Sequence, residues 1–225
     1  MPQLHDETFG PRAYIVEVGT EPAEAGSRNT IGGSPVLAAG QAWPSCYCGG
    51  RMAFYFQVGI PADVPTFGGH QLLVFQCPLH DEACFSPGSR SAQLPGRFWD
   101  DPPEPNEGAF WRILLHGGGN PVTDSDPFLQ PRRLTLAETP DERGNGRFEF
   151  KVSGVPAWAQ DPERYRCPCG ADLAFVCQIP EDFEFEMLPG RPEDFGELLF
   201  LGNMVYILAC PERCDPAAAW PVNQN

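Results

Sequence analysis

Lysine is nearly absent from this chain of 225 residues. Lys151 is the only lysine, and apart from four histidines every other basic side chain is an arginine. A Schiff-base enzyme or a lysine phosphate clamp would need Lys151, which lies in no motif for either chemistry. The acidic residues give a formal net charge of −15. Such a chain repels phosphate, so we expect no direct binding of nucleic acid and favour a basic protein partner.

The chain also lacks a long apolar run. It contains no stretch of about 18 apolar residues, the length that would indicate a membrane span. Its first residues, MPQLHDETFG, have neither a basic start nor an apolar segment. We therefore expect no signal peptide, no membrane association and a cytoplasmic location. Thiols stay reduced there, so the nine cysteines indicate metal ligands more than disulfides.

The common catalytic motifs are missing too. There is no Gly-x-Gly-x-x-Gly, no P-loop and no His-Glu-x-x-His. The string LHGGGN (115–120) imitates the oxyanion loop of esterases, but no Gly-x-Ser-x-Gly accompanies it, and we interpret it as a turn. The motifs favour a protein that catalyses no reaction.

Helical periodicity is weak, and turn residues are abundant. The chain has 24 glycines and 26 prolines, yet also 16 phenylalanines and five tryptophans, which argue against disorder. QLLVFQC (71–77) and MVYILAC (204–210) are continuous apolar runs between turn residues, typical of buried strands. We predict a mainly β fold, with a β-rich α+β fold as the alternative.

The sequence contains an internal repeat. SCYCGGRMAFYFQ starts at Ser45, and the similar RCPCGADLAFVCQ starts at Arg166, 121 positions later. Further on, Phe67–Pro78 matches Phe200–Pro211 at an offset of 133. Such self-similarity predicts a repeated supersecondary unit. We predict a first unit in 1–84, a Pro-, Gly- and acid-rich connector with one strand in 85–132, and a second unit in 133–225, together forming one compact pseudo-symmetric domain.

Each repeat carries a Cys-x-Cys-Gly and a later pair of cysteines, which are the four thiolates that a tetrahedral zinc site needs. The predicted ligands are Cys46, Cys48, Cys77 and Cys84 in the first repeat and Cys167, Cys169, Cys210 and Cys214 in the second. His80 is an alternative to Cys84. We therefore predict up to two Zn²⁺ ions, with disulfides or a [2Fe–2S] cluster as the alternatives. Cys177 aligns with Phe56 and is predicted to be a core thiol.

Two polar features recur or stand out. Gln57 and Gln178 end the equivalent strands of the two repeats, and we expect each to hydrogen-bond a neighbouring loop. In the second repeat, Phe183, Glu184, Phe185 and Glu186 alternate aromatic and acidic side chains. This pattern is typical of an edge strand with a solvated acidic face, and it also suits a rim that receives a basic peptide.

The order Gly-x-Pro, Cys-x-Cys-Gly, an apolar strand ending in Gln, then a strand running into Cys-Pro resembles the programmed cell death protein 2 family and the bacterial YwqG-like proteins. The resemblance covers residues 30–84 and 150–214, and the second copy, with Trp158 and Gln160, is the better match. Here Cys-x-Cys replaces the family's Cys-x2-Cys, and Leu37 stands where the second copy has Trp158. The resemblance implies a duplicated β-rich fold and, from its eukaryotic members, a chaperone role for a ribosomal protein.

Three functions follow from these features. We predict a zinc-stabilised protein-binding module, acting as a chaperone or adaptor for a basic client such as a ribosomal protein. The first alternative is an immunity or antitoxin protein that neutralises a toxin. The second is a zinc-dependent hydrolase, which fits least because a zinc ion with four cysteine ligands has no open position for water.

Overall fold

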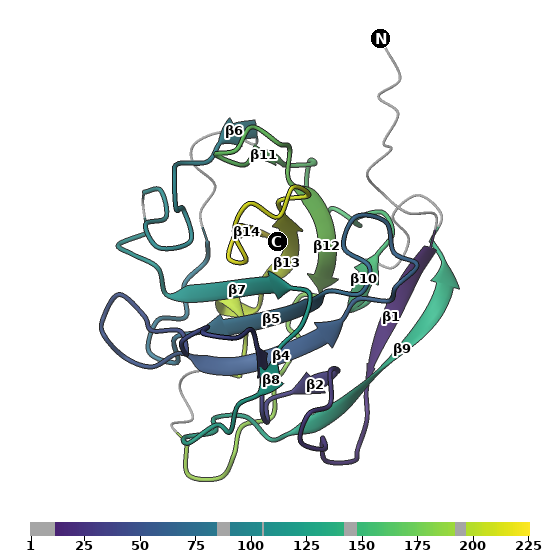
Figure 1. The fold of residues 1–225 in the computed structure, drawn as a ribbon, viewed down its shortest axis with the longest axis vertical. Coiled ribbons are helices and arrows are strands. Elements are labelled where there is room, and N and C mark those ends of the chain that lie inside the picture. Colours follow the sequence, from purple (N-terminus) through teal and green to yellow (C-terminus); the bar gives the residue numbers. More distant parts are fainter. Residues whose placement is uncertain (1–11, 85–90, 105, 142–147, 192–196) are drawn as a thin grey trace.

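The computed structural model describes residues 12–84, 91–104, 106–141, 148–191 and 197–225 (Figure 1). Within these residues the secondary structure consists of fourteen strands and one 3-10 turn, Phe200–Gly202 (η1). The predicted mainly β class is confirmed. In the same residues, no helix has the length and apolar character needed to cross a membrane.

Ten strands form one antiparallel sheet in the order β14-β13-β12-β10-β1-β9-β2-β4-β5-β7. The strands of the first repeat are Arg12–Val18 (β1), Thr30–Ile31 (β2), Ala53–Gly59 (β4), Gln71–Gln76 (β5) and Trp111–His116 (β7). Those of the second are Arg132–Pro140 (β9), Lys151–Ser153 (β10), Ala174–Ile179 (β12), Met204–Ala209 (β13) and Ala219–Gln224 (β14). Two small pairs lie outside the sheet: Val36–Leu37 (β3) with Asn120–Pro121 (β8), and Ser91–Gln93 (β6) with Arg164–Arg166 (β11).

The strand order has a pseudo-twofold centre between β1 and β9, which lie side by side in Figure 1. Outward from this centre, β2, β4, β5 and β7 on one side correspond to β10, β12, β13 and β14 on the other. The first strand of each repeat is therefore exchanged: β1 pairs with β10 of the second repeat, and β9 pairs with β2 of the first. The internal duplication is present in the fold, and the two halves share their central strands.

The registers of the outer strands repeat as well. Thr30 pairs with Gln57, and Lys151 pairs with Gln178 at the offset of 121. Ala53 pairs with Gln76, and the equivalent Ala174 pairs with Ala209. Both β4 and β12 carry a register shift at the same place in this pairing. Matching apolar, glycine and proline positions thus produce matching backbone paths.

The two glutamines act as predicted. The Gln57 Oε1 atom accepts a hydrogen bond from the Val36 N–H at 2.8 Å, and the Gln178 Oε1 atom accepts one from the Ala157 N–H at 3.0 Å. Each side-chain amide also donates to a backbone carbonyl in the chain before the short neighbouring strand. The acceptor is Ser27, before β2, in the first repeat and Glu149, before β10, in the second. These bonds hold the loop before each Cys-x-Cys against the sheet and satisfy buried backbone groups.

The strand in the connector completes the first half of the sheet. β7 pairs with β5 along its whole length, as β14 pairs with β13. The two outermost strands then meet, because the Leu115 N–H donates to the Pro216 carbonyl at 2.8 Å and the rings of Trp111 and Trp220 lie 5.9 Å apart. The sheet is therefore nearly closed, and side chains of both repeats fill one interior.

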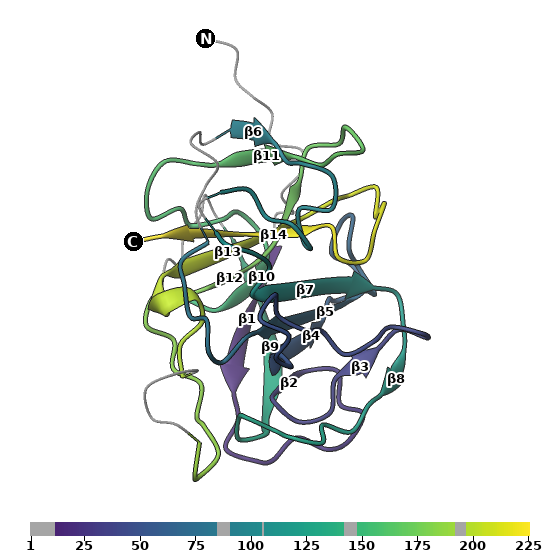
Figure 2. The same cartoon turned by 90° about the vertical axis from the view of Figure 1, so that its left-hand side faces the viewer.

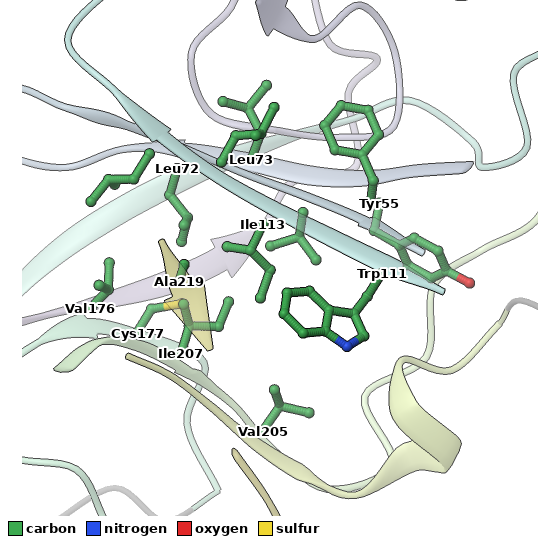
Figure 3. Packing of buried hydrophobic residues seen from close by; sticks show 14 of the residues in the cluster. Tyr55, Leu72, Leu73, Trp111, Ile113, Val176, Cys177, Val205, Ile207 and Ala219 are labelled. Atoms are coloured by element: carbon green, nitrogen blue, oxygen red, sulfur yellow. The ribbon is translucent and has the colours of Figure 1, made fainter. Parts of the chain in front are cut away.

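That interior explains the continuous apolar runs. Every residue of β5, β12 and β13 is buried, so these strands have no solvent-facing side that would require polar alternation. Figure 3 shows Ile113 and Trp111 of β7 across the interior from Cys177, Ile207 and Ala219 of the second repeat. The structure is one core rather than two.

Candidate metal centres

The first repeat brings four ligand atoms together. The Sγ atoms of Cys46, Cys48 and Cys77 and a ring nitrogen of His80 all lie within 4.8 Å of one another. The Nδ1 atom of His80 is 3.4 Å from the Cys46 Sγ atom and 3.3 Å from the Cys77 Sγ atom, and the Cys48 and Cys77 Sγ atoms are 4.0 Å apart. A tetrahedral zinc ion separates S/N ligand atoms by roughly 3.5–3.8 Å, so this cluster has the right size.

The second repeat forms an all-cysteine cluster. The Sγ atoms of Cys167, Cys169, Cys210 and Cys214 lie within 4.8 Å of one another. The Sγ atoms of two pairs, Cys167 with Cys214 and Cys169 with Cys210, are each 3.4 Å apart. This distance is far beyond a disulfide bond and close to the spacing of thiolates around one metal ion.

The same local structure presents both Cys-x-Cys pairs. In the first, the Cys46 N–H donates to the Gly50 carbonyl at 2.8 Å, and in the second the Cys167 N–H donates to the Ala171 carbonyl at 2.8 Å. The glycine after the second cysteine is needed because its φ is positive, +82° at Gly49 and +98° at Gly170. This tight knuckle aims both thiols at the turn that follows the second strand of the hairpin, β5 or β13.

The third and fourth ligands come from turns that end β5 and β13. The His80 N–H donates to the Cys77 carbonyl at 3.3 Å, and the Arg213 N–H donates to the Cys210 carbonyl at 3.0 Å. These turns place His80 and Cys214 beside the cysteine that begins each turn. Each cluster therefore joins the Cys-x-Cys knuckle before the first strand of a hairpin, β4 or β12, to the turn after the second strand, β5 or β13.

The prediction that Cys84 completes the first site is wrong, because His80 occupies that position. Cys84 is 4% exposed, lies outside the cluster and packs in the core. Burial raises the pKa of the Cys84 thiol, which keeps it protonated. The turn sequence could have identified His80 as the fourth ligand. Cys77-Pro-Leu-His80 stands where the second repeat has Cys210-Pro-Glu-Arg-Cys214.

Cys177 is a core thiol, as predicted. It is fully buried and belongs to neither cluster. Burial raises the pKa of its thiol as well. It packs at the place that Phe56 occupies in the first repeat, so its role is apolar packing.

Within each cluster the thiols differ in acidity. Burial raises the pKa of Cys46 to about 12 and that of Cys214 to about 11. In contrast, the Gly50 N–H lowers the pKa of the exposed Cys48, and the Ala171 N–H lowers that of the exposed Cys169. One thiolate per site is thus favoured by the backbone, while the thiols with a raised pKa need a nearby cation to become thiolates. Three or four sulfur ligands suit zinc and other thiophilic metals, and they do not suit Mg²⁺ or Ca²⁺.

The acidic-aromatic segment differs from its predicted form. Residues 183–186 form no strand, and Phe185 is buried. Its ring packs 5.1 Å from that of Tyr55, and Phe183 packs 5.4 Å from Phe150. The aromatic side chains therefore anchor the loop to the sheet, so Phe185 is not available to a partner.

The two glutamates of this segment remain exposed. Glu186 accepts from the Arg132 guanidinium at 3.0 Å, while Glu184 lines a surface pocket of about 480 Å³. Phe148, which is 78% exposed, and Val18 form part of the apolar lining. We call this pocket the acidic pocket; its lining residues are Val18, Ile31, Arg132, Phe148, Pro180, Glu181, Asp182, Phe183, Glu184 and Glu186.

No protein-family model matches the chain, and no curated protein matches it in sequence. The resemblance to the programmed cell death protein 2 family therefore stays a prediction from the residues. The metal clusters and the acidic pocket are the features on which a function can be built.

Proposed function

We propose that each cluster binds one Zn²⁺ ion in a structural role. The observation that carries this proposal is the presence of two sets of four S or N ligand atoms, each set lying within 4.8 Å and so close enough to surround one zinc ion. Each set is complete, so a bound ion has no open position for water or substrate. Zinc would supply the positive charge that lets the buried thiols ionise, and it would tie each knuckle to the end of its hairpin.

We further propose that this zinc-stabilised molecule binds a basic protein segment, as a cytoplasmic chaperone or adaptor. The net charge of −15 favours encounter with a basic client such as a ribosomal protein. The acidic pocket offers a local contact, because Glu181, Asp182, Glu184 and Glu186 outnumber Arg132 in its lining. Exposed Phe148 and Val18 would add the apolar contact that charge alone does not provide.

The test is charge reversal at this pocket. Glu181→Lys with Glu184→Lys should weaken binding of an isolated client at least tenfold, about 1.4 kcal/mol. The matched control is Glu104→Lys with Glu107→Lys, which makes the same change in net charge on exposed residues outside the pocket. Isothermal titration calorimetry with a client captured by cross-linking would measure both. Equal losses in the two variants would show that overall charge, and not this pocket, attracts the client.

A further inference from the structure

The short strand β8 covers the backbone of β3 in the first repeat. Asn120 of β8 pairs with Leu37 of β3, and the Val122 N–H donates to the Pro35 carbonyl at 2.9 Å. Two residues later, the buried carboxylate of Asp124 accepts from the Arg51 guanidinium at 2.6 Å. Residues 120–124 thus form an added segment, beginning with the strand β8, that is held by backbone bonds and one ion pair.

The second repeat has counterparts of the residues that contact β8 and Asp124 in the first repeat. At the offset of 121, Pro156, Trp158 and Asp172 stand where the first repeat has Pro35, Leu37 and Arg51. The equivalence is structural as well, because the bridge between Ser45 and Arg51 recurs between Arg166 and Asp172. Within the described parts of the chain, no segment pairs with the backbone of 156–158 as β8 pairs with β3.

A cavity of about 720 Å³ lies along this unpaired backbone. Half-buried Trp158 forms one wall, and its ring centroid lies 4.3 Å from that of Tyr206. Phe175 and Leu208 contribute buried apolar surface. The charged residues of the lining are Glu163, Arg164, Arg166 and Asp172. Figure 2 shows the two regions apart, with β11 at one end of the molecule and the β3–β8 pair at the other. We call this cavity the strand-acceptor groove.

We propose that the strand-acceptor groove binds an extended segment of a partner protein by strand addition, in the position that residues 120–124 take in the first repeat. An extended peptide there would donate a backbone N–H to the Pro156 carbonyl, as Val122 donates to that of Pro35. Its side chains would cover Trp158 and the apolar floor of the groove. Backbone groups without a partner of this kind, such as the Pro156 carbonyl, invite this contact.

The charge of the residue at position 51 or 172 determines which side chain the bound segment must place opposite it. Arg51 selects the acidic Asp124 in the first repeat, and Asp172 reverses that charge in the second. The side chain of Asp172 is 80% exposed. Its Oδ1 atom accepts from the Arg166 Nε atom at 3.0 Å, and an exposed pair of this kind contributes little, so the carboxylate can accept a second guanidinium. The bound segment therefore carries arginine or lysine two residues after the one that bonds Pro156. This groove is separate from the acidic pocket, and the inference does not rest on the client proposed there.

A peptide copied from the chain itself tests the inference. Residues 117–126, GGGNPVTDSD, would be synthesised with a fluorescent label, unchanged and with Asp124→Arg. Fluorescence anisotropy with the zinc-loaded protein should show the arginine peptide binding with a Kd of about 1 mM or tighter, and at least tenfold more tightly than the unchanged peptide. In the Asp172→Arg variant the preference should reverse, because the groove then has the charge that the first repeat presents.

Backbone methylation provides the control. N-methylation of the residue corresponding to Val122 removes the donor to the Pro156 carbonyl and should abolish binding, whereas N-methylation at the next residue, whose N–H faces away, should not. This comparison uses the unaltered protein, so it holds even if Asp172→Arg fails to fold. No saturable binding up to about 1 mM, equal binding of both methylated peptides, or an unchanged preference in a folded Asp172→Arg variant would overturn the inference.

Discussion

The single lysine of the chain is a structural residue. Lys151 is 1% exposed, and its Nζ atom donates to the Asp141 carboxylate at 2.8 Å and to the Val155 carbonyl at 2.7 Å. Burial lowers the pKa of Lys151, while Asp141 also accepts from the Val155 N–H. The first repeat has the neutral Thr30 at the equivalent place. The pair therefore holds the chain that leads from β10 toward the second knuckle.

Removing only one member of this pair should be costly. Lys151→Met leaves the Asp141 carboxylate buried without its cation, so we expect a loss of about 3–5 kcal/mol in the free energy of unfolding. Adding Asp141→Asn should recover part of that loss, because the uncompensated charge is removed. Urea denaturation of the zinc-loaded protein would measure both. A single-variant loss below about 1 kcal/mol would mean that Asp141 finds another way to be neutralised.

The fourth ligand of the first site gives a second prediction at this scale. His80→Ala should reduce the zinc content from two ions to one and lower the melting temperature, because three thiolates alone leave the coordination incomplete. Cys84→Ser should keep both ions, since Cys84 lies outside the cluster. In the second repeat, Cys167→Ser should lose zinc and Cys177→Ser should not. Elemental analysis of the four purified variants gives the counts, and loss of zinc in Cys84→Ser would return that residue to the ligand set.

At the scale of single elements, each candidate metal centre joins the two ends of a hairpin. The knuckle at Cys46 precedes β4 and the turn at Cys77 follows β5, and the second repeat has the same arrangement around β12 and β13. Removing zinc should therefore loosen the hairpin ends before the central strands β1 and β9. We expect a strong chelator to lower the melting temperature and to increase hydrogen exchange first around 45–52, 77–80, 166–173 and 210–214, since structural zinc can contribute on the order of 10 kcal/mol to folding. Exchange that rises first in β1 and β9 would contradict this assignment.

How far the sequence predicts each element depends on whether the signal is local. The buried strands β5 and β13 were predictable because their apolar runs are continuous and end at Cys-Pro. The segment at Phe183–Glu186 was not, because alternation of buried and exposed side chains also suits a loop whose rings pack on a sheet. The ligand role of His80 depended on a turn whose shape the spacing alone does not determine. β7 shares no evident sequence with β14, so its place as the outer strand of the first repeat appears only in the pairing.

At the scale of the whole molecule, the exchanged central strands make the two repeats interdependent. β1 lies between β10 and β9, and β9 lies between β1 and β2, so each repeat would expose unpaired strands without the other. The shared interior adds to this, because the ring of Phe56 in the first repeat packs 5.1 Å from that of Phe150 in the second. The two similar units predicted from the repeats share their central strands in one sheet. We therefore expect them to unfold as one cooperative unit.

Splitting the chain into two fragments tests whether the two repeats fold only together. Fragments 1–125 and 126–225 each contain one complete set of metal ligands, yet neither contains both central strands. We expect each fragment alone to lack a cooperative melting transition even with zinc present, because burial of its core needs the partner's first strand and hairpin. Mixed in equal amounts with zinc, they should form a one-to-one complex with the circular dichroism spectrum of the intact protein. Analytical ultracentrifugation would give the stoichiometry. If fragment 126–225 alone is a monomer that melts cooperatively with one bound zinc ion, the second repeat is an independent folding unit and the exchanged strands are dispensable.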